Sequence, residues 1–115
     1  GQQLYKIQAR IARVRDTMVI ENAGGGVAAR VHNALITPLR DRWQIDIPNG
    51  ENLFTRGNIL NHEYRIERGR FTVAAISKKW FRIRDTYGVE TAPNEDAALL
   101  LAITVVIDMM AHPGR

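Results

Sequence analysis

The C-terminal part of the chain contains an apolar run that has no polar face. Residues 97–107 read AALLLAITVVI, in which Thr104 is the single polar side chain. A membrane-spanning helix needs about 20 apolar residues, so this run is too short to cross a bilayer. A short helix that is apolar on every side is expected to be buried within its own protein. The rest of the chain must therefore form a structure that wraps it.

The residues before the apolar run predict where this helix begins. Asn94 follows Pro93 and can cap a helix N-terminus, while Glu95 and Asp96 favour the positive end of the helix dipole. We therefore expect a helix from Asn94 to about His112.

Residues 4–91 show the two-residue alternation of apolar and polar side chains that is typical of half-buried β-strands. The expected strands cover residues 4–11, 17–21, 27–35, 41–47, 53–56, 62–67, 71–76, 79–84 and 89–91. Glycines at 24–26 and the Pro48–Gly50 segment supply tight turns. About nine short strands at roughly ten-residue spacing favour an antiparallel sandwich or barrel. The expected fold class is therefore mainly β, a partial barrel around one buried C-terminal helix.

Geometry poses a difficulty for that fold. A barrel of about eight strands is filled by its own side chains, and the barrel known to enclose a helix has about eleven. Nine strands are therefore too few to close around the helix. Either the sheet is open and the helix is partly exposed, or the missing strands come from a removed N-terminal segment or from a second copy of the chain.

Composition restricts the class of protein. With 115 residues, of which 45% are hydrophobic and 24% charged, the chain forms one globular domain over residues 1–115. Residues 1–3 are interpreted as a tag remnant or a disordered end. The absence of cysteine excludes disulfides, thiolate zinc sites and thiol nucleophiles, and it fits a cytoplasmic protein. The dominance of arginine over lysine is common in bacteria with GC-rich genomes.

Positive charge is concentrated in one part of the chain. The net charge is +4, yet residues 65–84 carry seven basic side chains against the single acid Glu67 and therefore hold +6. The remainder of the chain is therefore slightly negative. If residues 78–84 form a regular strand, Phe81 and Ile83 point inward while Lys78, Trp80, Arg82 and Arg84 point outward.

A tryptophan among exposed cations suits a membrane interface, whereas a bulge near Ser77 would instead bury Trp80. Solvated basic faces are also common without any ligand. The residues that we predict to bind an anion or lipid are Lys78, Lys79, Trp80, Arg82, Arg84, Arg68 and Arg70.

The other reactive side chains lack the spacing that catalysis or metal binding requires. Ser77 is the only serine and has no Gly-x-Ser-x-Gly elbow around it. His32, His62 and His112 are too far apart for a metal-ligand motif, and the acids near Gly88 lack the alternate spacing of an EF-type calcium loop. We therefore predict no enzymatic activity, no catalytic residues, no metal and no cofactor.

Several segments together resemble a known family. These are Ile76–Phe81, Asp85–Val89 and Ala98–Met110, with Gly57–Tyr64 upstream. They are similar to the LURP-one-related family, relatives of the phospholipid scramblases that share the Tubby-like fold. The resemblance implies a closed barrel of about twelve strands around a hydrophobic C-terminal helix. Family members usually carry roughly fifty further residues before the position of Leu4, enough for three or four strands. The resemblance thus implies a truncated chain, a dimerising chain or a shortened natural member.

The resemblance also implies a role. We expect a non-enzymatic, cytoplasmic module that associates peripherally with anionic phospholipid or phosphoinositide headgroups through the basic strand, and that does not bind nucleic acid. The alternative is a structural or protein-interaction domain whose exposed sheet edges recruit partners, or a second copy that completes the barrel, by strand addition.

Overall fold

A computed structural model describes residues 5–11, 16–33, 42–77 and 89–111. Within these ranges, eight strands form one antiparallel sheet in which each strand pairs with the next along the chain. The elements are β1 (Tyr5–Ile11), β2 (Asp16–Asn22), β3 (Val27–Asn33), β4 (Trp43–Asp46), β5 (Leu53–Asn58), β6 (Glu63–Arg68), β7 (Phe71–Ile76), β8 (Val89–Thr91) and the helix α2 (Ala97–Ala111). The expected fold class, mainly β with one C-terminal helix, is confirmed.

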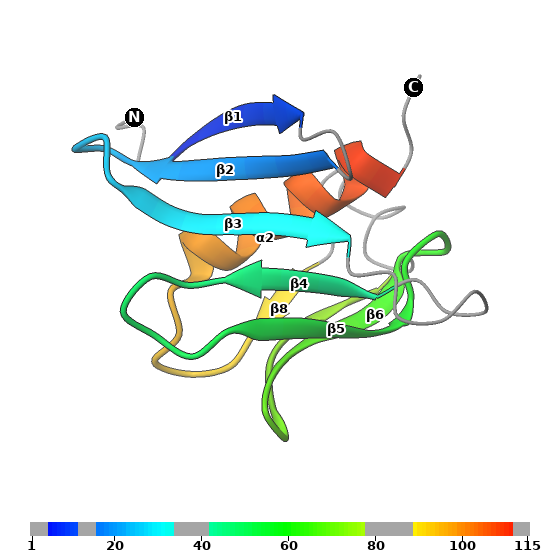
Figure 1. The fold of residues 1–115 in the computed structure, drawn as a ribbon. Helices are drawn as coiled ribbons and strands as arrows, with labels where there is room; N and C mark the ends of the chain where they lie inside the picture. Colours follow the sequence, from blue (N-terminus) through cyan, green and yellow to red (C-terminus); the bar gives the residue numbers. More distant parts are fainter. Residues whose placement is uncertain (1–4, 12–15, 34–41, 78–88, 112–115) are drawn as a thin grey trace.

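The sheet curls into a half-barrel with α2 on its concave side (Figure 1). The helix packs against β1, β2, β3 and β8. The side chains of Ile103, Val106 and Ile107 are fully buried there. Burying one such side chain stabilises a fold by about 1.5–3 kcal/mol, so this contact is a main source of the free energy of folding.

The strands face the core as the alternation predicts. Ala29 and Val31 of β3, Ile45 of β4 and Ile66 of β6 are fully buried, while the residues between them point to the outer face. Eight of the nine expected strands are present, and the ninth, residues 79–84, lies outside the described residues. The inner face of the sheet is thus apolar, and charged side chains are left for the outer face.

Two of the turns that join the strands have the geometry that their residues favour. Between β2 and β3, the Asn22 side-chain oxygen accepts hydrogen bonds from the backbone N–H groups of Gly24 and Gly26, each at 3.0 Å. Gly25, between them, has a φ of 91°. Between β4 and β5, the Gly50 N–H donates to the Ile47 carbonyl at 3.1 Å. Both predicted turns are confirmed.

The helix is not enclosed on every side, which corrects the first expectation drawn from its composition. Leu101 and Met109 are 44% and 50% exposed, and they lie on the face of α2 that points away from the sheet. The described residues thus form an open sheet with a partly exposed helix, and completion of the barrel by further N-terminal residues or by a second copy stays a prediction. None of the described residues belongs to a helix that has both the length and the apolar character needed to traverse a bilayer.

The expected cap of this helix is also corrected. Asp96, not Asn94, is the capping residue, because its side-chain oxygen accepts a hydrogen bond from the Leu99 N–H at 3.1 Å. Asn94 has a φ of 68° and belongs to the turn before the helix. Both residue types cap helices well, so their backbone conformation and position decide which one does so here.

A bulge changes the direction of the side chains at the start of β7. Ile66 of β6 pairs with Ala74, but Glu67 pairs with Thr72, so Val73 is an extra residue. Both Val73 and Ala74 are consequently buried, and Phe71 is left 53% exposed beside the β6–β7 turn. Such a bulge also increases the local twist of the sheet.

Gly57 is the one strand residue whose missing side chain the sheet requires. Its φ is 124°, and a Cβ atom there would lie 2.7 Å from the carbonyl oxygen of Glu63 and 2.9 Å from Cα of Tyr64. Tyr64 is its direct partner on β6. Any larger residue would therefore both strain the backbone and push β5 and β6 apart.

We expect the substitution Gly57→Ala to lower the free energy of unfolding by about 1–3 kcal/mol or more, since the strain adds to the steric clash. Urea denaturation followed by circular dichroism measures this. The matched control is Gly24→Ala, where a Cβ would meet only the Asn22 side chain at an ordinary 3.6 Å. Equal losses for the two variants would contradict the role of Gly57.

We expect Asp96→Ala to lower the free energy of unfolding by about 1 kcal/mol, because the first turn of α2 loses its capping acceptor. Asp96→Asn keeps a side-chain oxygen in place and should retain most of the stability. Denaturation curves of the two variants test the cap, and an Asn variant as unstable as the Ala variant would argue against it.

Candidate functional site

Most of the predicted anion-binding residues lie outside the described part of the chain. Lys78, Lys79, Trp80, Arg82 and Arg84 belong to this group, and their role stays a prediction. The other two, Arg68 and Arg70, flank the turn between β6 and β7.

Arg68 is engaged in an ion pair. Its Nη2 donates to Oε1 of Glu95 at 2.6 Å, and its Nη1 donates to Oε2 of the same carboxylate at 3.3 Å. The hydrogen bond to Glu95 raises the pKa of Arg68, against a smaller opposing effect of burial. The guanidinium is therefore held charged, and it joins the β6–β7 turn to the segment that precedes α2.

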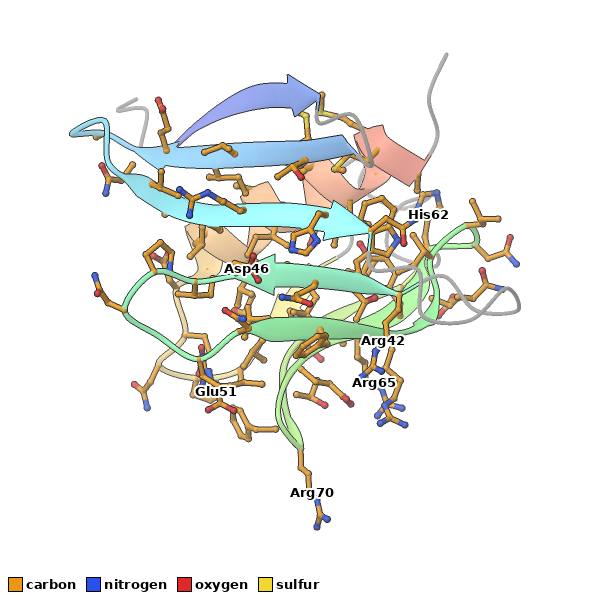
Figure 2. All side chains as sticks on the ribbon, in the orientation of Figure 1. Arg42, Asp46, Glu51, His62, Arg65 and Arg70 are labelled. Carbon is orange, nitrogen blue, oxygen red and sulfur yellow. The ribbon has the colours of Figure 1, made fainter. Side chains whose placement is uncertain are left out.

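Arg70 is exposed and projects from the tip of the β6–β7 hairpin (Figure 2). Gly69, with a φ of 61°, makes the sharp turn before it. The exposed Phe71 follows directly. This tip thus presents a cation and an aromatic ring to the surroundings.

A second group of arginines lies on the outer face of β5 and β6, extending to Arg42 just before β4. Arg56 of β5 and Arg65 of β6 are direct cross-strand partners, and both are exposed. Gln44 of β4 pairs with Phe54 of β5, so continuing this register by two residues brings Arg42 level with Arg56. We call Arg42, Arg56 and Arg65 the arginine row.

Neighbouring side chains fix the positions of two members of the arginine row. The Arg42 guanidinium carbon lies 5.2 Å from the centre of the Phe54 ring, within the range of a cation–π contact. Arg56 Nε donates to Oε1 of Glu67 at 3.1 Å. Figure 2 shows Arg42 and Arg65 in the same part of the outer face. Among the residues that the structure describes, Arg65 has no carboxylate partner.

The sequence prediction missed Arg42 and Arg56 and did not single out Arg65. A contiguous count of charge cannot find residues that lie fourteen and nine positions apart and meet only through strand pairing. The available signal was the alternation itself, because each of the three occupies an outward position of its segment.

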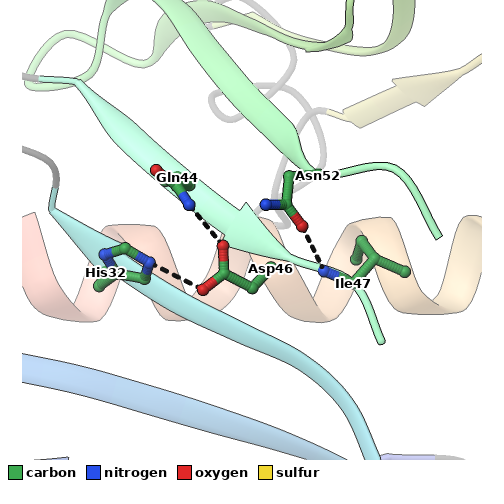
Figure 3. A network of polar contacts seen from close by, with 5 residues as sticks. All are labelled: His32, Gln44, Asp46, Ile47 and Asn52. Atoms are coloured by element: carbon green, nitrogen blue, oxygen red, sulfur yellow. Dashed lines mark hydrogen bonds and ion pairs between the residues drawn. The ribbon is translucent and has the colours of Figure 1, made fainter. Parts of the chain in front are cut away.

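A polar network lies beside the arginine row, on the outer face of β3 and β4 (Figure 3). His32 Nε2 is 3.1 Å from Oδ2 of Asp46, and the Gln44 side-chain amide donates to Oδ1 of the same carboxylate at 2.6 Å. The Nδ1 atom of His32 is buried without a hydrogen-bond partner. Because this nitrogen is not accessible, the pair cannot act as a general base toward a substrate, and we interpret it as a link between the two strands.

His62 makes a comparable link to the helix. Its Nδ1 atom is 3.7 Å from Oδ1 of Asp108, and both side chains are mostly buried. The sequence predicted that His62 begins the strand. With a φ of 57°, it belongs instead to the turn before β6. Over residues 5–11, 16–33, 42–77 and 89–111, no cluster of three or more His, Cys, Asp or Glu side chains could hold a metal ion.

The chain is similar to known proteins in sequence. The family model described as LURP-one-related matches residues 1–108. The chain belongs to the LURP-one-related family. It is also 22% identical over 131 aligned positions to the "Uncharacterized protein YxjI" of Bacillus subtilis, covering 96% of this chain and 80% of that protein. No solved structure matches the chain significantly.

Membership in the LURP-one-related family indicates a Tubby-like domain. Neither the family description nor the name of the Bacillus relative states a reaction or a ligand. The surface chemistry of this LURP-one-related domain is therefore the better guide to its role, and its outer face carries the arginine row together with the acids Asp46, Glu63 and Glu67.

For this LURP-one-related domain we expect Arg68→Gln and Glu95→Gln each to lower the free energy of unfolding by about 1 kcal/mol. The pair is bidentate, but Arg68 is 36% exposed and water screens part of its attraction. The double variant should lose less than the sum of the two single losses. Arg70→Gln, at an exposed neighbour, is the control and should change stability by less than about 0.5 kcal/mol. Strictly additive losses in the double variant would show that the pair contributes nothing.

Proposed function

We propose that this domain is a non-enzymatic module that associates peripherally with anionic phospholipid headgroups through its outer basic face. The observation that supports the proposal most is the arginine row, in which Arg56 and Arg65 face each other directly across two strands. Like charges in directly opposite positions destabilise a sheet, so an anionic partner would relieve a cost that the free protein bears.

The energetics of such an association are favourable. Each Lys or Arg near an anionic membrane contributes about 1 kcal/mol, so three to five exposed cations suffice for reversible binding. Arg70 adds a charge at the hairpin tip, where the aromatic ring of Phe71 suits the interfacial region of a bilayer. Residues 78–84, where the sequence predicts the basic strand, contribute two further lysines and two further arginines to the charge of the domain.

Sedimentation with vesicles tests the proposal. We expect the protein to bind vesicles that contain phosphatidylglycerol and to remain in solution with pure phosphatidylcholine. Binding should weaken as salt is raised to physiological ionic strength and beyond, because the Debye length falls to about 8 Å at 0.15 M. Replacing Arg42, Arg56 and Arg65 together by Gln should reduce the bound fraction severalfold.

A different outcome would favour the other role considered above, recruitment of a protein strand. β1 and β8 lie at the two ends of the described sheet. Recovery that is equal with anionic and neutral vesicles, in wild type and triple variant alike, would contradict lipid association. A strand-adding partner would instead remain bound after the arginines are neutralised and be lost when proline is placed in β1.

A further inference from the structure

The arginine row differs from an ordinary basic face in its register. Diffuse surface charge places cations far apart, whereas here Arg56 and Arg65 are direct cross-strand partners and Arg42, just before β4, lies level with them when the β4–β5 register is continued by two residues. Directly opposite residues have Cβ atoms about 4.5–5.5 Å apart, so the flexible ends of these side chains can reach one common ligand. The row is therefore short enough for all three members to contact a single small anion.

Two contacts in the free protein restrict the side chains of the arginine row before any ligand binds. The Phe54 ring under Arg42 restricts where that guanidinium can lie, and Glu67 holds Arg56 at its Nε atom. Glu67 accepts its hydrogen bond from Nε of Arg56, and the two terminal nitrogens of the guanidinium can donate to a second acceptor. Less side-chain freedom is then lost when an anion binds.

The charge of the row sets the charge of its ligand. Three guanidinium groups and the carboxylate of Glu67 leave two positive charges. A phosphomonoester carries about −1.5 to −2 at neutral pH and offers three terminal oxygens, while a phosphodiester carries a single charge. Arginine also binds phosphate oxygens in a bidentate fashion, which lysine cannot do.

We propose that Arg42, Arg56 and Arg65 form one discrete site for a phosphomonoester group. This inference rests on the proposed function and deepens it, because it names the headgroup chemistry that the basic face selects. The site is bounded along the row by Ala75, the small partner of Arg65 on β7, and then by Glu90. Along β6 it is bounded by the exposed Glu63. Acidic side chains therefore flank the row on both of these sides.

The test compares two kinds of vesicle with the same measured surface charge. One contains phosphatidic acid, a phosphomonoester lipid, and the other phosphatidylglycerol, a diester. We expect the wild-type protein to bind the phosphatidic acid vesicles about tenfold or more tightly, because a charged hydrogen bond is worth more than screened attraction. Arg65→Gln should abolish this preference.

The matched controls remove the same charge elsewhere. Arg30→Gln and Arg70→Gln also delete an exposed arginine, and both should keep the preference for phosphatidic acid while losing only a little overall binding. A preference that falls equally in Arg65→Gln and in the controls, or measurable binding of wild type that is equal for both vesicles, would overturn the site. The proposed function would survive that result, since it requires only anionic lipid.

Soluble ligands separate a lipid headgroup from a free phosphate. We expect glycerol 3-phosphate to raise the thermal unfolding midpoint of wild type and to leave that of Arg65→Gln unchanged. Without any anion, Arg65→Gln should unfold at a temperature no lower than wild type, because the repulsion from Arg56 is gone. Stabilisation by glycerol 3-phosphate without binding to any anionic vesicle would keep the site and overturn the proposed function. If neither glycerol 3-phosphate nor any anionic vesicle binds the wild-type protein, the site and the proposed function are both overturned.

Discussion

The packing of α2 into the concave face of the sheet is the contact on which the rest of the structure depends. A helix that lies on a flat sheet needs a polar face toward water, and α2 has none. Its side chains Ile103, Val106 and Ile107 are removed from water completely. Even its one hydroxyl, that of Thr104, donates to the Leu100 carbonyl within the helix at 2.9 Å. A sheet that packs around such a helix must curl, and the side chains on its inner face are mostly apolar among the residues that the structure describes.

The curl has identifiable local causes. Extra residues in β3 and β7 shift the register of the β2–β3 and β6–β7 pairs, and bulges of this kind bend a strand and increase its twist. Gly57 allows β5 to approach β6 more closely than any residue with a Cβ atom could. One bulge lies on each side of the centre of the sheet. The ion pair between Arg68 and Glu95 joins the β6–β7 hairpin, which contains the second bulge, to the segment before the helix.

Features of short range could be predicted from the sequence, and those that depend on pairing could not. Alternation predicted which residues of β4 and β6 face the core, whereas the bulge in β7 breaks the alternation there, and the glycines at 24–26 predicted their turn. The Arg68–Glu95 pair joins residues 27 positions apart, and Asn94 and Asp96 are equally good caps until the backbone conformation is known. The arginine row needed the register of two strand pairs, which no local pattern specifies.

The same register that forms the core also forms the candidate site. In β6, the burial of Tyr64 and Ile66 requires Arg65 to point outward, and in β5 the burial of Thr55 does the same for Arg56. A slip by one residue would place guanidinium groups in the apolar core, so the burial of the core side chains holds the arginines on the outside at fixed spacing. Repulsion between them costs far less than exposing that core, because they lie in water. The fold can therefore maintain an arrangement of like charges that the strands alone would not favour.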